Sequence, residues 1–119
     1  MSQKVLVVGA SENPSRYSNK AILQLKENKH EVFAFGNKLG NVQGVKISIK
    51  FPNVDVDTVT IYLNKTNQKD YYHQIFQCNP FRIIFNPGSE NEELSKLALN
   101  KGIKVMNACT LVMLSIGNF

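Results

Sequence analysis

The sequence has few of the features that mark secreted, metal-binding or membrane proteins. Only two of its 119 residues are cysteine, Cys78 and Cys109, and they do not form a Cys-x-x-Cys pair. This excludes a disulfide framework and a thiolate zinc site, and no other ligand set has metal-binding spacing. No apolar run approaches the roughly 20 residues of a membrane span. The few residues before the first apolar run leave no space for a signal peptide, so we expect a cytoplasmic protein.

The charge excess is small and does not indicate a nucleic-acid binder. Fourteen Lys and Arg against nine Asp and Glu give a net charge of +5, which favours anionic partners such as the phosphates of a small molecule. Most basic residues are lysines spread singly, and arginine occurs only at Arg16 and Arg82, whereas nucleic-acid binders cluster such residues beside exposed aromatic side chains. We therefore expect a small-molecule nucleotide ligand, and neither a nucleic acid nor a membrane as partner.

Short apolar runs alternate with helical patterns along the whole chain. Residues 5–8 are four consecutive apolar residues, three of them β-branched, which is typical of a strand buried on both faces at the centre of a parallel sheet. Similar runs predict further strands, and apolar residues at helical spacing predict helices between them. The predicted strands cover 5–8, 31–35, 57–63, 82–85 and 104–106, with one short edge strand within 39–53; the predicted helices cover 18–28, 68–78 and 89–102, with a short one after 110.

This alternation predicts an α/β fold with a single domain over residues 1–119: a Rossmann-type, doubly wound, mostly parallel sheet with helices on both faces. We expect Ser18 and Thr110 to cap the first and last helices, and Ser89 with Glu92 to form a capping box. In such folds a ligand binds beyond the carboxyl ends of the strands, where the strand order reverses. Small or hydrogen-bonding residues follow four strands, at 9–11, 36–38, 62–64 and 86–88.

The first two strand ends narrow the choice of nucleotide. A dinucleotide fingerprint reads G-x-G-x-x-G, but after Gly9 the next two glycine positions hold Ser11 and Pro14, and the Gly-Lys-Ser/Thr of a P-loop is absent. A NAD site has an acidic residue after the second strand, whereas this chain has Gly36-Asn37-Lys38. A lysine there suits an extra phosphate. Coenzyme A and NADP both carry one on the adenosine ribose, and both stay open at this point.

The loop between the first strand and the first helix offers hydrogen-bond donors for a pyrophosphate. Ser11 and Ser18 supply hydroxyls, and Arg16 supplies a guanidinium. The amides at the start of the following helix add donors at the positive end of the helix dipole. This role needs no reactive group.

Catalytic side chains are harder to find. His30 is predicted in a solvated loop at the opposite edge of the sheet, and His73 on a helix surface. The glutamates within residues 90–93 open a helix, where carboxylates stabilise its positive end. Cys109 follows the last strand, and we weigh two roles for it: a small buried apolar residue, which we favour, or a thiol that forms a mixed disulfide with the pantetheine of coenzyme A.

Four segments resemble the small stand-alone CoA-binding domain proteins, which are related to the N-terminal CoA-binding domain of succinyl-CoA synthetase α subunits. They are Gly9-Ala10-Ser11-Glu12-Asn13-Pro14-Ser15-Arg16-Tyr17-Ser18, Asn37-Lys38, Asn86-Pro87-Gly88 and Ala108-Cys109-Thr110-Leu111-Val112-Met113-Leu114. The resemblance covers nearly the whole chain. It departs at Gly36-Asn37, where many relatives carry Asn-Pro.

The resemblance implies non-catalytic binding of coenzyme A or a short acyl-CoA, because the synthetases carry their phosphohistidine and second substrate site in regions that this sequence lacks. It implies a pyrophosphate site at Gly9, Ala10, Ser11, Arg16, Tyr17 and Ser18, an adenosine phosphate site at Asn37 and Lys38, and adenine or pantetheine contacts at Tyr62, Leu63 and Asn64. The predicted binding residues also include Asn13, Gly36, Asn86, Pro87 and Gly88.

Two other classes of function stay open. An NADP-dependent oxidoreductase would need a Tyr-Lys or similar pair near the crevice, for which Lys65 is the only near candidate. A nucleotide-sensing regulatory protein needs no such pair, and an RNA-contacting or scaffold protein ranks third. We expect a monomer or a weak homodimer, with the apolar segment 111–116 packed on its own domain.

Overall fold

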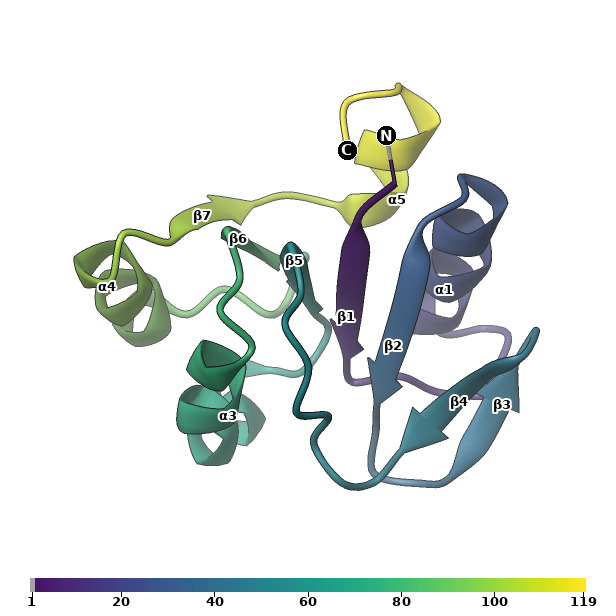
Figure 1. Ribbon diagram of the computed structural model, residues 1–119, viewed down its shortest axis with the longest axis horizontal. Coiled ribbons are helices and arrows are strands. Elements are labelled where there is room, and N and C mark those ends of the chain that lie inside the picture. The colour runs from purple at the N-terminus through teal and green to yellow at the C-terminus, as the bar shows by residue number, and fades with distance from the viewer. Residues whose placement is uncertain (1) are drawn as a thin grey trace.

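A central sheet with helices on both sides forms the molecule (Figure 1). The computed structural model describes residues 2–119. The seven-stranded sheet has the order β3-β4-β2-β1-β5-β6-β7, and all neighbouring strands run parallel except β3 and β4. The strands are β1 (Lys4–Val8), β2 (Glu31–Phe35), β3 (Gly40–Val42), β4 (Val45–Ser48), β5 (Thr58–Ile61), β6 (Arg82–Phe85) and β7 (Lys104–Asn107).

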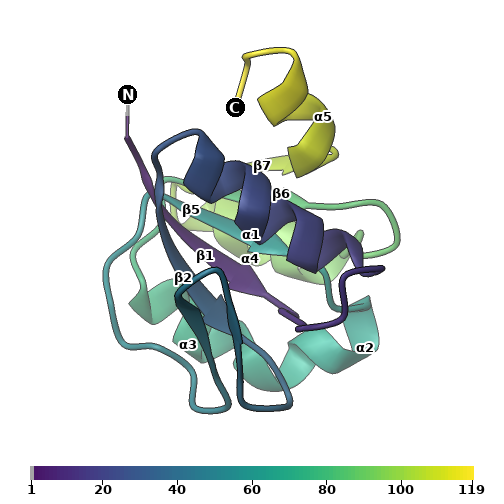
Figure 2. The ribbon, with the colours of Figure 1, turned by 90° about the vertical axis from the view of Figure 1, so that its right-hand side faces the viewer.

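The helices cover both faces of this sheet, which Figure 2 shows with α1 in front and α4 behind. They are α1 (Tyr17–Glu27), α2 (Lys65–Gln68), the 3₁₀ turn η1 (Lys69–Tyr71), α3 (Tyr72–Gln77), α4 (Glu92–Asn100) and α5 (Thr110–Ser115). Among residues 2–119, no helix combines the length and the apolar character that crossing a bilayer requires.

The strand β1 separates two apolar cores. Val5 and Val7 pack with residues of α1 and α5 on one face, whereas Leu6 and Val8 pack with residues of α3 and α4 on the other. All four side chains are completely buried, because successive side chains of a strand point to opposite faces and both faces are covered. The predicted central strand and the predicted α/β fold class are confirmed.

The strand order reverses at β1. From β1 the chain continues through α1 to β2 on one side, whereas β5, β6 and β7 follow one another on the other side. In a doubly wound sheet the crevice for a ligand lies at this reversal, beyond the carboxyl ends of the strands. The relevant strand ends are therefore those of β1 and β5.

Two element predictions need correction. The single edge strand expected within 39–53 is the hairpin β3–β4, whose turn residues Gln43 and Gly44 both have positive φ (51° and 87°), as a tight two-residue hairpin turn requires. The helix expected over 68–78 begins earlier, at Lys65, and is divided into α2, η1 and α3. Asn64 explains the early start, because its side chain caps α2.

The three predicted helix caps are wrong. Ser18 is buried at the second position of α1, and the residue before that helix, Arg16, makes no side-chain cap. Asn91 caps α4 in place of Ser89, since its side chain accepts the N–H three positions on. Thr110 is the first residue of α5 and uses its hydroxyl in a buried contact with β5.

Candidate functional site

A pocket of about 680 Å³ lies at the carboxyl edge of the sheet, over the point where the strand order reverses. Its walls come from the ends of β1, β2, β5 and β6 and from the start of α1. Most of the residues predicted to form a site line this pocket. They are Gly9, Ala10, Ser11, Arg16, Tyr17, Ser18, Gly36, Asn37, Tyr62, Leu63 and Pro87.

Five predicted residues lie elsewhere. Asn13 and Lys38 line a smaller hollow of about 260 Å³, which shares lining residues with the pocket. Asn64, Asn86 and Gly88 line neither space. Asn64 caps α2, and the N–H of Gly88 donates to the carboxylate two residues on. Asn86 is only 2% exposed and belongs to the core.

One wall of the pocket consists of residues that were not predicted as binding residues. Phe35 ends β2, Ile49 follows β4, and Asn67, Asp70 and Tyr71 belong to α2 and η1. The only sequence signal for Asn67, Asp70 and Tyr71 was Asn64, which follows a strand. Asparagine is a preferred residue before a helix, so it could have indicated the early start of α2.

The turn after β1 brings its backbone against the end of β2. The N–H groups of Gly9 and Ala10 both donate to the carbonyl oxygen of Phe35, each at 2.9 Å, and Gly9 has a φ of 94°. This φ favours glycine. A Cβ atom on Gly36 would overlap the carbonyl oxygen of Ala10, so glycine is required there for a different reason, the close approach of two backbones.

The loop between β1 and α1 is held in shape by its own hydrogen bonds. The Ser11 hydroxyl accepts the N–H of Asn13 at 3.0 Å, and the Asn13 side chain accepts both the N–H and the hydroxyl of Ser15 at 3.0 and 2.8 Å. The buried Asn19 donates from its amide to the Ser11 carbonyl at 3.0 Å. These hydrogen bonds therefore define the conformation of the loop.

Several backbone donors of this loop have no partner within residues 2–119. They are the N–H groups of Ser11, Glu12, Tyr17 and Ser18. The last two belong to the first turn of α1, an 11-residue helix whose amino end carries a partial positive charge. Arg16 adds an exposed guanidinium beside them. Such a group of donors binds anions, phosphates in particular.

The acidic residue of the loop points away from these donors. The Glu12 carboxylate accepts the N–H of Asn41 in β3 at 2.8 Å, and its side chain lies against Gly40. On the other side of the hairpin, the Lys26 ammonium of α1 donates to the carbonyl of Gln43 at 2.6 Å. These two contacts fasten the β3–β4 hairpin to the loop and to α1.

Beneath the pocket, a buried polar network joins β5, β6 and α5. The Asn86 amide donates to the Thr60 hydroxyl at 2.7 Å and to the Ile61 carbonyl at 3.0 Å, and its oxygen accepts the N–H of Thr110 at 2.9 Å. The hydroxyls of Thr60 and Thr110 are 2.8 Å apart and share a hydrogen bond. This network fixes the ends of two strands under the pocket.

Tyr62 is the one residue of the lining with an unusual polar group. Its hydroxyl is buried and has no hydrogen-bond partner within residues 2–119. Burial raises the pKa of Tyr62 to about 12, although the nearby hydroxyls of Thr110 and Thr60 act in the opposite direction without reaching hydrogen-bond geometry. Tyr62 is therefore neutral at physiological pH.

The two histidines and Cys109 do not line the pocket. His30, expected to be solvated, is partly buried at the amino edge: its Nδ1 accepts the N–H of Gln3 at 3.0 Å, and its ring packs 5.2 Å from that of Phe119. His73 is exposed, as predicted. Cys109 is partly buried just before α5 and does not line the pocket.

The remaining candidates for catalysis or metal binding are Lys65, Cys78 and any cluster of metal-ligating side chains. Lys65, the candidate partner of an oxidoreductase pair, lines a different hollow, between α2 and the start of α4. Burial raises the pKa of the Cys78 thiol, which contacts the Pro52 carbonyl at 3.6 Å. Within residues 2–119, no three His, Cys, Asp or Glu side chains come together as metal ligands.

Residues 3–115 match a protein family described as CoA binding domain. A crystal structure described only as that of an uncharacterized protein is similar over 100% of this chain and 99% of its own, with 43% identity and a TM-score of 0.97. A hypothetical protein from Pyrococcus horikoshii OT3 is 24% identical over 91% of this chain and 78% of its own, with a TM-score of 0.81. A Thermus thermophilus protein is 19% identical over 99% and 91%, with a TM-score of 0.83. The similarity to the Pyrococcus and Thermus proteins bears on the fold alone. No curated protein sequence matches the chain.

Proposed function

The chain belongs to the CoA binding domain family, and from this premise we propose that it binds coenzyme A or a short acyl-CoA in the pocket at the carboxyl edge of the sheet, as a binding module without catalysis. The observation that carries the proposal is the group of unpartnered N–H donors at Ser11, Glu12, Tyr17 and Ser18. Together with Arg16, they offer charge-assisted hydrogen bonds to a diphosphate.

The chemistry of the pocket walls suggests how the ligand is oriented. With the diphosphate at the start of α1, the extra ribose phosphate would reach the small hollow beside Lys38, past the end of β2. The adenine would lie on the apolar wall formed by Phe35, Ile49 and Tyr71, and the pantetheine would leave the pocket past Pro87. In this orientation each part of the ligand faces a pocket wall of matching polarity.

Isothermal titration calorimetry tests the proposal with four ligands: coenzyme A, dephospho-CoA, NADP and NAD. Coenzyme A should bind most tightly, because dephospho-CoA and NAD lack the extra ribose phosphate and NADP carries it at the 2′ instead of the 3′ position. Arg16→Ala should weaken coenzyme A about tenfold or more, as expected for the loss of charge-assisted hydrogen bonds. Lys38→Ala should reduce the affinity for coenzyme A to that for dephospho-CoA and leave dephospho-CoA unchanged.

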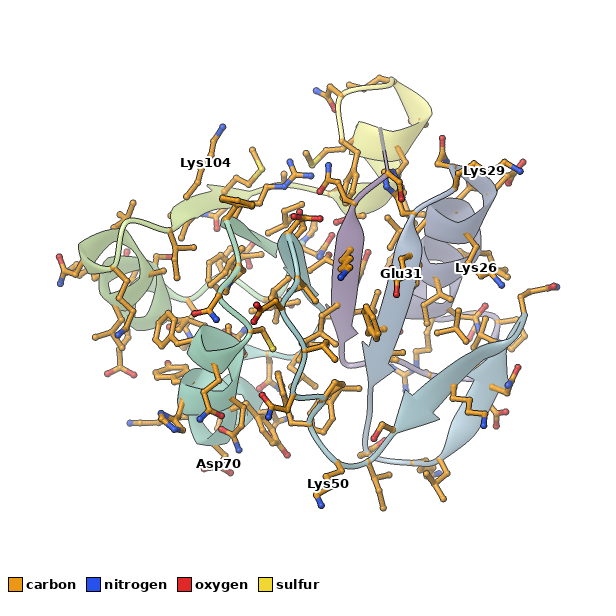
Figure 3. The ribbon with its side chains drawn as sticks, in the orientation of Figure 1. Lys26, Lys29, Glu31, Lys50, Asp70 and Lys104 are labelled. Carbon is orange, nitrogen blue, oxygen red and sulfur yellow. The ribbon has the colours of Figure 1, made fainter. Side chains whose placement is uncertain are left out.

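Lys104→Ala is the matched control, because Lys104 lies on β7, at the edge of the sheet away from the pocket (Figure 3). It removes the same charge and should change no affinity. The absence of heat with millimolar coenzyme A would refute the proposal. Tighter binding of NADP than of coenzyme A would favour the dinucleotide alternative.

A further inference from the structure

The pocket contains two charged side chains of opposite sign. Arg16 comes from the loop before α1, and Asp70 comes from the 3₁₀ turn η1 on the opposite wall. Figure 3 labels Asp70 at the carboxyl edge of the sheet. Its carboxylate is exposed and accepts no hydrogen bond from another residue within 2–119. Asp70 therefore has free acceptors in a pocket whose opposite wall is built to attract phosphates.

A free carboxylate there would oppose the binding of a polyanion. Two like charges repel at distances of several ångströms, and the repulsion is stronger in a partly enclosed pocket than in water. A carboxylate only accepts hydrogen bonds, so its repulsion is offset when the ligand presents a donor to it. The wall with Asp70 thus suits the part of a ligand that combines a neutral ring with a donor.

The surroundings of Asp70 fit a flat, apolar ring. Its neighbour Tyr71 packs edge-on against Phe35, with 4.9 Å between ring centroids, and stacks on Phe51 at 5.9 Å. Ile49 lines the same pocket with 57% of its surface exposed, which is a large apolar area for a ring to cover. An aromatic base resting on Ile49 and Tyr71 would bring its edge to Asp70.

We infer that the Asp70 carboxylate recognises the exocyclic amino group of adenine by accepting a hydrogen bond from it. This inference rests on the proposed function, since it concerns the adenine end of the same ligand. Adenine presents an N–H donor at its 6-amino group. A site built around such a hydrogen bond discriminates strongly against an analogue that lacks the donor, because the acceptor is then left unpaired.

A cycle of two ligands and two proteins tests the inference by calorimetry. The ligands are coenzyme A and 1,N6-etheno-CoA, in which the amino group is closed into a ring and donates no hydrogen bond. The proteins are the unaltered chain and Asp70→Ala, which removes the acceptor. We expect the unaltered chain to bind coenzyme A about tenfold more tightly than etheno-CoA, and Asp70→Ala to lose most of this preference.

The direction in which the affinity for the two ligands changes on substitution of Asp70 separates the inference from its alternatives. An increase in affinity for both ligands on Asp70→Ala would mean that the carboxylate only repels the phosphates, and it would overturn the inference. An equal loss for both ligands would place the contact on another donor, such as a pantetheine amide, and would also overturn it. Glu31→Ala is the matched control, because Glu31 begins β2 at the opposite edge of the sheet.

The two proposals fail differently. If the unaltered chain does not bind coenzyme A, the proposed function is refuted and this inference with it. If the chain binds coenzyme A but shows no preference over etheno-CoA, only the role of Asp70 is refuted. Asp70 lies exposed on the surface, so circular dichroism spectra and melting temperatures of Asp70→Ala should match those of the unaltered chain.

Discussion

Replacing Asn86 by alanine tests whether this residue stabilises the fold or contacts the ligand. The sequence suggested a ligand contact, whereas the structure places Asn86 in the buried network beneath the pocket, with three hydrogen bonds to β5 and α5. The replacement removes all three. The Thr60 hydroxyl keeps its bond to Thr110, and the Ile61 carbonyl keeps the N–H of residue 86. Only the N–H of Thr110 is left buried without a partner.

The size of the effect follows from this count. An unsatisfied buried donor costs about 2 kcal/mol, and each of the two other hydrogen bonds contributes about 1 kcal/mol net, so the free energy of unfolding should fall by about 4 kcal/mol. For a chain of 119 residues, about 1 kcal/mol corresponds to about 4 °C in melting temperature, which gives a decrease of about 16 °C.

Urea unfolding followed by far-ultraviolet circular dichroism measures this change, since the chain has no tryptophan for fluorescence. Tyr62→Phe is the control, because it removes a buried hydroxyl that has no partner and should leave stability unchanged or raise it. A loss below about 1 kcal/mol in Asn86→Ala would contradict the network's role. Unchanged stability with much weaker binding of coenzyme A would restore Asn86 as a ligand contact.

Two more predictions concern the edges of the sheet. Gly36→Ala should destabilise the protein by about 1–3 kcal/mol and weaken binding of coenzyme A, because the new Cβ pushes the Ala10 carbonyl and its loop away from β2. Urea unfolding measures the stability and calorimetry measures the affinity. Unchanged values of both would refute the close approach of the two backbones. Burial and the Arg82 charge lower the pKa of His30 below its ordinary 6.5. As the pH falls, His30 therefore takes up a proton in the unfolded chain before it does so in the folded protein. Stability should then decrease as pH falls below 6.5, and melting curves of His30→Gln should lack that decrease.

The strands that the sequence predicted best are those whose position in the fold is fixed by burial on both faces. The four apolar residues at 5–8 allowed only a central strand, and β1 pairs on both sides. The hairpin β3–β4 was seen as one strand because its pieces are short and half exposed, so their pattern carries little information. The start of α4 was misplaced because Ser89 and Asn91, two residue types of similar N-cap propensity, both precede the helix and only Asn91 caps it.

The part of the site that was predicted from the sequence is the part that local motifs mark. Loops that follow strands of a parallel sheet converge at one edge, so Gly9, Gly36 and Tyr62 could be brought together from topology alone. Ile49 and Asp70 reach the same pocket only through the packing of the hairpin and of η1. Neither segment has a motif that specifies where it packs. Asn86 shows the opposite error, since a polar residue after a strand can serve the core as well as a ligand.

The internal hydrogen bonds of the loop between β1 and α1 bear on the speed of binding. Because Ser11, Asn13 and Asn19 already hold this loop in shape, a diphosphate meets donors that need no rearrangement, and little conformational entropy is lost on contact. Association should then be a single rapid step set by diffusion and charge, without a slower isomerisation after the first encounter.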